Sequence, residues 1–591
     1  MIKGGEFLIK DQEAKDIFIP EEFGEDQLMM ASATKEFVEK ELDPHRERFE
    51  KKDYKLTEDC MKKAGELGLL GIGVPAEYGG MGMPFNTSVL ICDRISGANG
   101  SFSTAFGAHT GIGTLPIQLY GDDMQREKYL PKLATGEWMS CYCLTEPGAG
   151  SDANSGKTKA VLTEDGKHYL ITGQKMWISN AGFADVLIVF ARIEDDKNIT
   201  AFILEKGMEG IILGEEEHKL GLNSSSTRQV FFTQVKVPIE SLLGGRGNGF
   251  KIAMNALNVG RIKLSAAVLD ACRRMISLST NYSNERIQFG VPIAKFGAIK
   301  HKLADMAVRT YAIESATYRA GNEIEKNIKR LESEGVDRQE AHLKGIEEYA
   351  IECSIVKVLG SETIQYCSDE GIQIYGGMGY SAETPMEAAY RDARIARIYE
   401  GTNEINRMLL VGMILKKAMK GELDIMTPAM KVASDLMSIP SFETPDESKL
   451  FAIEKENIKK LKKSILMVAG KAAQHFAMDI EKEQEVLMSL ADMIIDVYTA
   501  ESGLLRTEKL SLKNGEAATQ HQITMSKLFL YSAIKNCQKA GEEVILSFAE
   551  GDEQRMLLMG LKRFTKGYTI NPKELRREIA AKLIEENKYC F

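Results

Sequence analysis

Residues 186–204 read VLIVFARIEDDKNITAFIL and form the clearest β-type stretch in the chain. Two apolar runs, Val186–Ala191 and Thr200–Leu204, flank a polar turn, as expected for paired strands. Runs of the same kind occur at Lys159–Leu162, Tyr169–Ile171 and Gln229–Val237. Together they predict a compact antiparallel β unit within residues 137–245.

Helical periodicity dominates on both sides of this β unit, so we predict a mainly α protein with a central β unit. A segment at residues 1–25 precedes an N-terminal helical domain at 26–136, and a second helical domain follows at 246–415. One stripe at helical spacing consists of Leu303, Met306, Thr310 and Ile313. We predict an irregular linker at 416–449 and a helical extension at 450–591. The linker is marked by Pro428, Pro440 and Pro445.

The extension contains an internal repeat. Residues 303–319 read LADMAVRTYAIESATYR, and residues 490–506 read LADMIIDVYTAESGLLR. Eight of the 17 positions match in register, at an offset of 187. Helical amphipathicity alone would supply two or three matches, so we interpret the extension as a duplication of the helical domain before it.

Composition excludes several classes of function. The 591 residues include 75 Lys and Arg against 85 Asp and Glu, a net charge of −10, which argues against nucleic-acid binding. No apolar run is long enough for a spanning helix, and the N-terminus lacks the features of a targeting segment, so we expect a cytoplasmic protein. The nine cysteines, an odd number, predict reduced thiols. No second Cys or His pair accompanies Cys141 and Cys143, so we predict no metal site.

Five motifs carry the functional information. In chain order they are YCLTEPGAGSD (142–152), WISN (177–180), ERIQFG (285–290), GIQIYGGMGY (371–380) and RDARIARIYEGTNE (391–404). Together they resemble the acyl-CoA dehydrogenases, flavoenzymes that oxidise the α–β bond of acyl-CoA thioesters. The resemblance covers roughly Gly24 to Gly412 and implies an N-terminal helical domain, a β-barrel-like domain and a C-terminal four-helix domain. The very-long-chain branch is the most similar, because it shares a C-terminal helical extension.

The resemblance places the catalytic base at Glu400. Removing a proton α to a thioester needs a base, and a carboxylate becomes a better one when burial raises its pKa. Some relatives carry the base one residue before Arg261. Here that residue is Gly260, which leaves Glu400 without a competitor.

The resemblance also implies FAD as the cofactor. Trp177 is expected to lie against the isoalloxazine, and the Ser179 hydroxyl near its N5 atom. Arg286 is expected to bind the pyrophosphate of the FAD in a neighbouring subunit, because its planar fork matches phosphate oxygens. The remaining predicted FAD contacts are Tyr142, Leu144, Thr145, Phe289, Gln373, Gly376, Gly377, Thr402 and Asn403.

For the substrate, the resemblance implies contacts with Ser151, Asn258, Arg261 and Gly401. The small residues of 101–113 are expected to line an acyl pocket, although they could equally serve tight helix packing. We therefore expect oxidation of long straight-chain acyl-CoA to trans-2-enoyl-CoA in fatty-acid β-oxidation, with electrons passed to an electron-transfer flavoprotein. The alternatives are an oxygen-reducing acyl-CoA oxidase and a scaffold or assembly protein with the same fold.

The helical extension at 450–591 affects the oligomeric state that we expect. A duplicated helical domain could occupy the surface that joins two dimers in tetrameric family members, so we expect a homodimer. One helix of the extension has an apolar stripe formed by Ile458, Leu461, Ile465, Val468, Ala472 and Phe476, with five lysines nearby. We favour packing on the bundle for this stripe and keep peripheral contact with an anionic membrane as the alternative.

Overall fold

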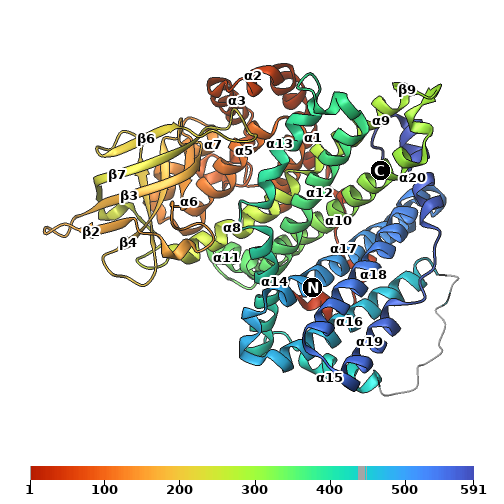
Figure 1. Cartoon of the computed structure of the whole chain (residues 1–591). Coiled ribbons are helices and arrows are strands. Elements are labelled where there is room, and N and C mark those ends of the chain that lie inside the picture. Colours follow the sequence, from red (N-terminus) through yellow and green to blue (C-terminus); the bar gives the residue numbers. More distant parts are fainter. Residues whose placement is uncertain (1, 437–445, 447–448) are drawn as a thin grey trace.

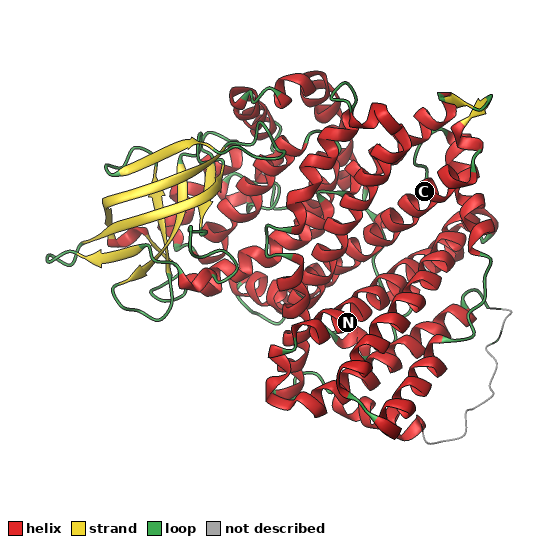
Figure 2. Ribbon diagram, viewed as in Figure 1, coloured by secondary structure: helices red, strands yellow, loops and turns green. Residues whose placement is uncertain are grey.

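The computed structural model describes residues 2–436, 446 and 449–591. A twisted sheet lies at one end, and helices form the rest of the molecule (Figures 1 and 2). The predicted order of a helical domain, a β domain and two further helical regions is confirmed. Among the described residues, no helix is long and apolar enough to cross a membrane.

The N-terminal domain is a set of short helices around one apolar core. Their bounds are α1 Glu25–Phe37, α2 Arg46–Glu50, α3 Tyr54–Glu66, α4 Phe85–Ser96, α5 Gly100–Gly107, α6 Leu115–Tyr120 and α7 Asp123–Thr135. After α5 the chain continues into a wider helical turn, η8, at Ala108–Gly113. Together α4, α5 and η8 present a wall rich in small side chains toward the centre of the molecule.

The β unit is a sheet in the order β6-β7-β3-β2-β4-β5-β8, with β1 paired to β4. Its strands are β1 Ser140–Cys143, β2 Lys159–Leu162, β3 His168–Ser179, β4 Val186–Ile193, β5 Thr200–Glu205, β6 Ile211–Glu216, β7 Thr227–Pro238 and β8 Leu242–Leu243. The prediction of a purely antiparallel unit is wrong in one respect, because β4 pairs in parallel with both β1 and β2. Both pairings bring together strands that are distant in sequence, which short-range turn signals do not reveal.

The second helical domain is built on long helices. These are α8 Gly249–Ala266, α9 Leu269–Glu285, α10 Gly297–Ser333, α11 Arg338–Glu348, α12 Ala350–Tyr375, α13 Pro385–Ala393 and α14 Asn403–Met419. A small hairpin, β9 Ile287–Gln288 with β10 Val291–Pro292, interrupts them after α9. The predicted stripe from Leu303 to Ile313 lies on α10 and is fully buried.

The segment predicted as a linker is partly helical. The helix α14 extends to Met419, and α15 occupies Met426–Leu436. Pro428 lies in the first turn of α15, where the backbone N–H needs no intrahelical acceptor. Pro440 and Pro445 lie outside the described residues. The extension consists of α16 Ala452–Phe476, α17 Gln484–Asn514, α18 Gln520–Phe548, α19 Gly551–Thr565 and α20 Pro572–Glu586.

The two repeat copies lie on α10 and α17, which contact each other directly. Arg319 of α10 donates to Ser502 Oγ at 2.9 Å and to Glu501 Oε2 at 3.0 Å. In the opposite direction, Arg506 of α17 donates to Glu314 Oε2 at 2.7 Å and Ser315 Oγ at 3.3 Å. Matching positions of the two copies therefore make reciprocal contacts, the pattern of a two-fold interface within one chain.

The N-terminal segment at residues 1–25 contributes to this interface between the two helical bundles. Phe7 is fully buried and meets the Tyr498 ring edge-on at 4.8 Å. Gly5 donates its backbone N–H to Glu352 of α12, and Glu21 accepts hydrogen bonds from Arg506 of α17. The segment therefore ties the extension to the second helical domain.

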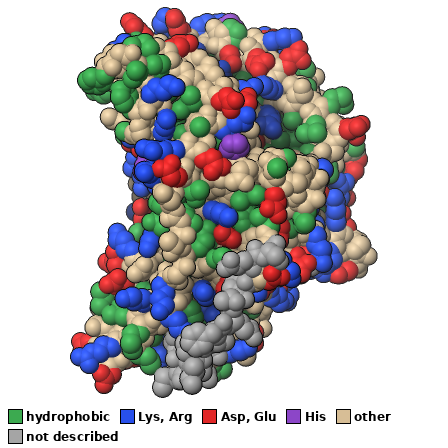
Figure 3. All heavy atoms as spheres, turned by 90° about the vertical axis from the view of Figure 1, so that its right-hand side faces the viewer, with side chains coloured by type: hydrophobic (Ala, Val, Ile, Leu, Met, Phe, Trp, Pro, Cys, Tyr) green, Lys and Arg blue, Asp and Glu red, His purple; other side chains and the backbone are tan. Residues whose placement is uncertain are grey.

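The apolar stripe of α16 packs on the other extension helices. Ile458, Leu461, Ile465, Val468 and Ala472 are all buried in the core. Several of the nearby lysines are also engaged: Lys455 pairs with Glu508, Lys459 with Asp11 and Lys462 with Glu501. Acidic and basic side chains are interspersed on the face shown in Figure 3. This arrangement favours packing and removes the apolar face that a membrane contact through α16 would need.

Candidate active site

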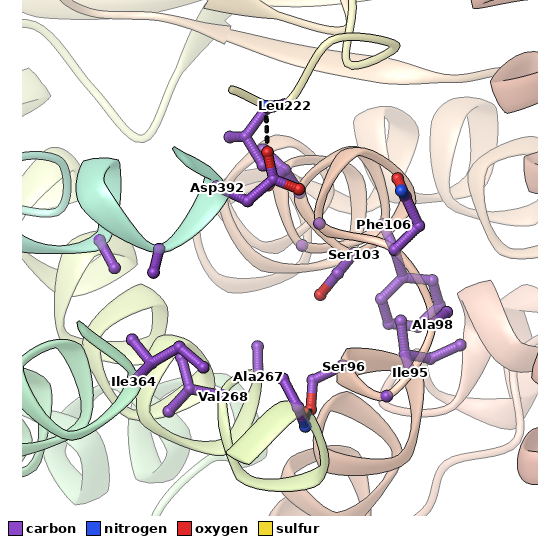
Figure 4. A pocket seen from close by; sticks show the side chains of 18 of the residues that line it. Ile95, Ser96, Ala98, Ser103, Phe106, Leu222, Ala267, Val268, Ile364 and Asp392 are labelled. Carbon is purple, nitrogen blue, oxygen red and sulfur yellow. Dashed lines mark hydrogen bonds between the residues drawn. The ribbon is translucent and has the colours of Figure 1, made fainter. Parts of the chain in front are cut away.

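A cavity of about 450 Å³ lies between the N-terminal domain and the second helical domain. Its volume is in the range of small-molecule sites. Helices α4 and α5 with η8 form one wall, and α8, α9, α12 and α13 form the others. Figure 4 shows side chains that converge on this space: Ile95, Ser96, Ala98, Ser103, Phe106, Leu222, Ala267, Val268, Ile364 and Asp392. Much of the 101–113 stretch lines the cavity, and its role in holding an acyl chain stays a prediction.

Glu400 and Ser179 reach the same cavity from different domains. Glu400 stands in the loop before α14 with φ +59°, the left-handed region that a side chain rarely adopts. A Cβ on Gly260 of α8 would lie 2.4 Å from Glu400 Oε2. The absence of a side chain at Gly260 therefore makes the room that the Glu400 carboxylate occupies.

The surroundings of Glu400 change its acidity. Burial raises its pKa to about 7, against the opposing attraction of the Arg261 and Lys357 cations. Tyr142 and Tyr399 also lie within electrostatic reach of the carboxylate. Glu400 Oε2 is buried and has no hydrogen-bond partner in the described part of the chain. A carboxylate with a pKa near neutrality and a free oxygen is suited to accept a proton.

Hydrogen bonds from neighbouring elements hold the loop at 400–403. Lys357 of α12 is fully buried and donates to the Gly401 carbonyl at 2.6 Å and to Asn403 Oδ1 at 2.8 Å. Asn406 Nδ2 donates to the carbonyls of Gly401, at 2.8 Å, and of Thr402, at 3.0 Å. Thr402 Oγ1 accepts the Ile405 N–H and caps α14. The backbone around Glu400 is thus fixed from two helices.

Two of the predicted substrate residues support this loop from α8. Arg261 donates from Nε to the Glu400 carbonyl at 3.2 Å and from Nη1 to Asn258 Oδ1 at 2.8 Å. Both side chains are buried. Their predicted contact with CoA stays a prediction, as does that of the exposed Ser151. Asn403, predicted near FAD, has its amide bonded to Lys357, Ser361 and Glu362.

The β unit presents a second group of predicted residues. Tyr142 and Leu144 are buried at the end of β1, and Thr145 follows them. Trp177, near the end of β3, is 52% exposed and also has a left-handed backbone, with φ +61°. The Tyr142 hydroxyl is buried without a partner in the described residues. A half-exposed indole and an unpaired buried hydroxyl, both presented by the β unit, fit a planar, polar-edged ring such as a flavin.

A third group of predicted FAD contacts lies at the β9–β10 hairpin and the end of α12. Arg286 and Phe289, in the β9–β10 hairpin, are exposed, and Phe289 is 93% exposed. Tyr282 of α9 stacks on Tyr375 of α12 with ring centroids 4.1 Å apart, which brings the end of α12 beside this hairpin. Three of the predicted residues are exposed in this region: Gln373 near the end of α12, and Gly376 and Gly377 just after it. In Figure 1 this group lies at the opposite end of the molecule from the sheet that carries Trp177.

Family models match four parts of the chain. They are described as acyl-CoA dehydrogenase N-terminal domain (residues 24–137), middle domain (141–235) and C-terminal domain (247–415), and a further acyl-CoA dehydrogenase C-terminal domain (460–563). A protein of Bacillus subtilis (strain 168) named "Probable acyl-CoA dehydrogenase" is 44% identical over 589 residues, 99% of this chain and 98% of that one.

The chain belongs to the acyl-CoA dehydrogenase family. Members of this family are FAD-dependent oxidoreductases, so membership sets the activity class and the cofactor. The human mitochondrial very long-chain specific acyl-CoA dehydrogenase is 36% identical over 485 residues, 77% of this chain and 70% of that one. A crystal structure described as an acyl-CoA dehydrogenase complexed with FAD, from Bacillus anthracis, superposes with a TM-score of 0.96 at 43% identity and full coverage of both chains.

Sequence reasoning missed several side chains at the site of this acyl-CoA dehydrogenase. Lys357 and Asn406 hold the loop at 400–403, and Glu362 and Arg407 extend the hydrogen-bond network behind it. A signal for Lys357 was present in the sequence, since it is a lone lysine within the apolar run IVKVL at 355–359. A charged residue amid buried helix positions is seldom there without a partner.

Proposed function

We propose that this acyl-CoA dehydrogenase oxidises long straight-chain acyl-CoA to trans-2-enoyl-CoA, with Glu400 as the base, and passes the electrons to an electron-transfer flavoprotein. The observation that carries the proposal is Glu400 itself. Its carboxylate faces the cavity, has a pKa raised to about 7 and leaves Oε2 without a partner in the described chain.

The reaction removes two hydrogens from adjacent carbons of the acyl chain. Glu400 takes the α-hydrogen as a proton on its carboxylate, and the β-hydrogen leaves with its electron pair. Bound FAD would supply the acceptor for that hydride, its N5 atom. The α–β bond becomes double, so atoms and electrons balance. Burial within the protein already raises the Glu400 pKa to about 7, and an acyl chain filling the cavity would exclude more water and raise it further.

The shape of the cavity supports a long acyl chain. Helices α8 and α9 follow one another along its wall, contributing residues from Gly260 near the base to Arg274. The cavity volume of about 450 Å³ lies within the range of small-molecule sites, and small apolar side chains make up much of the lining. These features suit an acyl chain.

The separation of the predicted flavin residues supports a homodimer. Trp177 and Tyr142 belong to the β unit at one end of the molecule, whereas Arg286 and Gln373 are exposed near the β9–β10 hairpin at the opposite end. A single FAD contacting both groups would need two chains. The reciprocal contacts between the repeat copies support a dimer rather than a tetramer, because the extension covers the α10 face that would otherwise join two dimers.

The experiment uses purified full-length protein. We expect a yellow flavoprotein whose absorbance near 450 nm bleaches when palmitoyl-CoA is added without oxygen. Reoxidation by an electron-transfer flavoprotein should be far faster than by oxygen, whereas fast reoxidation by oxygen would indicate an oxidase. A colourless protein that binds no FAD would favour a scaffold.

Hybrid dimers test the shared site. Glu400→Gln and Arg286→Ala variants are each expected to be nearly inactive. When they are unfolded and refolded together, hybrids gain one site with an intact Glu400 from one chain and an intact Arg286 from the other. Recovery of activity supports the shared site, and no recovery despite hybrid formation would contradict it. Light scattering should give twice the mass of one chain.

A further inference from the structure

Asp305 and Asp492 occupy the same position in the two repeat copies, and each pairs with an arginine from the other bundle. Asp305 of α10 accepts a hydrogen bond from Arg576 Nε of α20 at 2.7 Å. Asp492 of α17 accepts one from Arg407 Nε of α14, also at 2.7 Å. The two pairs match in residue type and in distance, and the aspartates are matching positions of the repeat, but the arginines are not. The pairs lead to different parts of the molecule.

The ion pair of Asp492 with Arg407 is connected by further polar contacts to the loop at 400–403, which carries Glu400. Arg407 Nη2 lies 2.8 Å from Glu362 Oε1 on α12, and the same oxygen accepts the Asn403 amide N–H at 3.1 Å. Asn403 Oδ1 in turn accepts from Lys357 Nζ at 2.8 Å, and Lys357 donates to the Gly401 carbonyl at 2.6 Å. An uninterrupted series of polar contacts therefore connects a side chain of the extension to the residue beside Glu400.

We propose that Asp492 is a positioning residue, through which the extension holds the loop that carries the base Glu400. The inference rests on the proposed function of Glu400. It gives the extension a role in the reaction, in addition to covering the face of α10.

The backbone of the loop explains why such support is needed. Glu400 has a left-handed φ of +59°, a conformation that costs free energy and persists only when the surroundings impose it. Arg407 is largely enclosed and is shared between the carboxylates of Asp492 and Glu362. Without the charge of Asp492, the guanidinium loses one of its two anchors, and Glu362 and Asn403 lose their fixed partner.

The matched control is Asp305→Asn. Among the described residues, Arg576 makes no contact with the loop at 400–403. Asp305→Asn therefore weakens a comparable interdomain pair that is not connected to Glu400. The test compares Asp492→Asn with Asp305→Asn in the full-length, FAD-loaded protein. The measurements are FAD content, Tm, the rate of anaerobic flavin reduction at saturating palmitoyl-CoA, its pH midpoint and KM.

We expect the two variants to retain FAD and to melt within a few degrees of each other. Asp492→Asn should reduce its flavin about tenfold more slowly than Asp305→Asn, with little change in KM, because a misplaced base affects the chemical step more than binding. Its pH midpoint should move upward as Lys357 and Arg261 are held less closely to Glu400. Arg407→Met should be at least as slow, and adding Asp492→Asn to it should cause little further loss.

Equal reduction rates and equal pH midpoints in Asp492→Asn and Asp305→Asn would overturn the inference. So would a full additive loss in the double variant. The proposed function is tested separately by the parent protein: if palmitoyl-CoA fails to bleach it, the proposed function fails whatever the variants do.

Discussion

Arg319 and Arg506 stand at the same position of the two repeat copies, and each guanidinium is held by the other copy. Arg319 lies 4.5 Å from the centre of the Tyr498 ring, and Arg506 lies 4.3 Å from that of Tyr311. Tyr498 and Tyr311 are themselves matching positions of the repeat. The interface is therefore reciprocal in its cation–π contacts as well as in its ion pairs.

Because the contacts are reciprocal, removing either arginine should lower the free energy of unfolding by a similar amount. Arg506→Met should lower the free energy of unfolding by roughly 3 kcal/mol, because it leaves the buried Glu314 with one cation fewer. Arg319→Met should cost a similar amount through Glu501. Calorimetry should show both variants melting several degrees below the parent. Arg555→Met is the control, because its pair with Asp552 is exposed. Unchanged melting in both buried variants would contradict a stabilising interface.

A second prediction concerns the space beside the base. Gly260→Ala is compatible with the helix but places Cβ within 2.4 Å of Glu400 Oε2, so the carboxylate must move. We expect flavin reduction to fall about ten- to hundredfold while FAD stays bound. Gly412→Ala, in α14 with no atom near its added Cβ, is the control and should leave the rate unchanged. Normal reduction by Gly260→Ala would show that the carboxylate need not occupy its present position.

A third prediction concerns pH. Glu400 must be ionised to accept a proton, and its pKa is raised to about 7, so the reduction rate should rise with pH and level off above about 8. The rate at pH 6 should be about one tenth of that at pH 8. Lys357, whose pKa burial lowers to about 7, titrates in the same range, so the measured midpoint belongs to the pair. A flat profile between pH 6 and 8 in stopped-flow reduction would contradict the role of Glu400.

A fourth prediction concerns acyl length. Each buried CH₂ contributes about 0.8 kcal/mol, so kcat/KM should rise from butyryl-CoA to palmitoyl-CoA. Ala271 lines the cavity on α9, the helix that follows the one carrying Gly260. Ala271→Phe should therefore reduce turnover of palmitoyl-CoA and spare butyryl-CoA. A maximum at butyryl-CoA in the parent, or equal losses for both substrates, would contradict this account of the cavity.

Much of the fold was accessible from the sequence because its signals are local. The buried stripe from Leu303 to Ile313 follows from helical periodicity, and the strand at Val186–Ala191 from an apolar run beside a polar turn. The parallel pairing of β4 with β1 and β2 joins strands distant in sequence, which no local pattern encodes. Helix α15 was missed because Pro428 was taken as a break, although proline is tolerated in a first helical turn.

In the site, too, local motifs could be predicted from the sequence, whereas contacts that depend on tertiary packing could not. The motif around Glu400 predicted that this residue is the base, and the structure places Glu400 at the cavity; its role as base stays a prediction. The apposition of Gly260 and Glu400 depends on how α8 packs against the loop before α14, so spacing could not show it. The repeat could be recognised in the sequence. The hydrogen bond from Arg319 to Glu501 could not be predicted, because it depends on how α10 and α17 pack against each other.

The most direct test of the account is flavin reduction in Glu400→Gln. The amide keeps the shape of the side chain and most of its contacts but cannot accept the α-proton. We predict that the variant binds FAD and palmitoyl-CoA as the parent does, while anaerobic bleaching of the flavin slows by at least about 10²–10⁴-fold. Bleaching at a rate near that of the parent, with FAD fully bound, would contradict the assignment of Glu400 as the base.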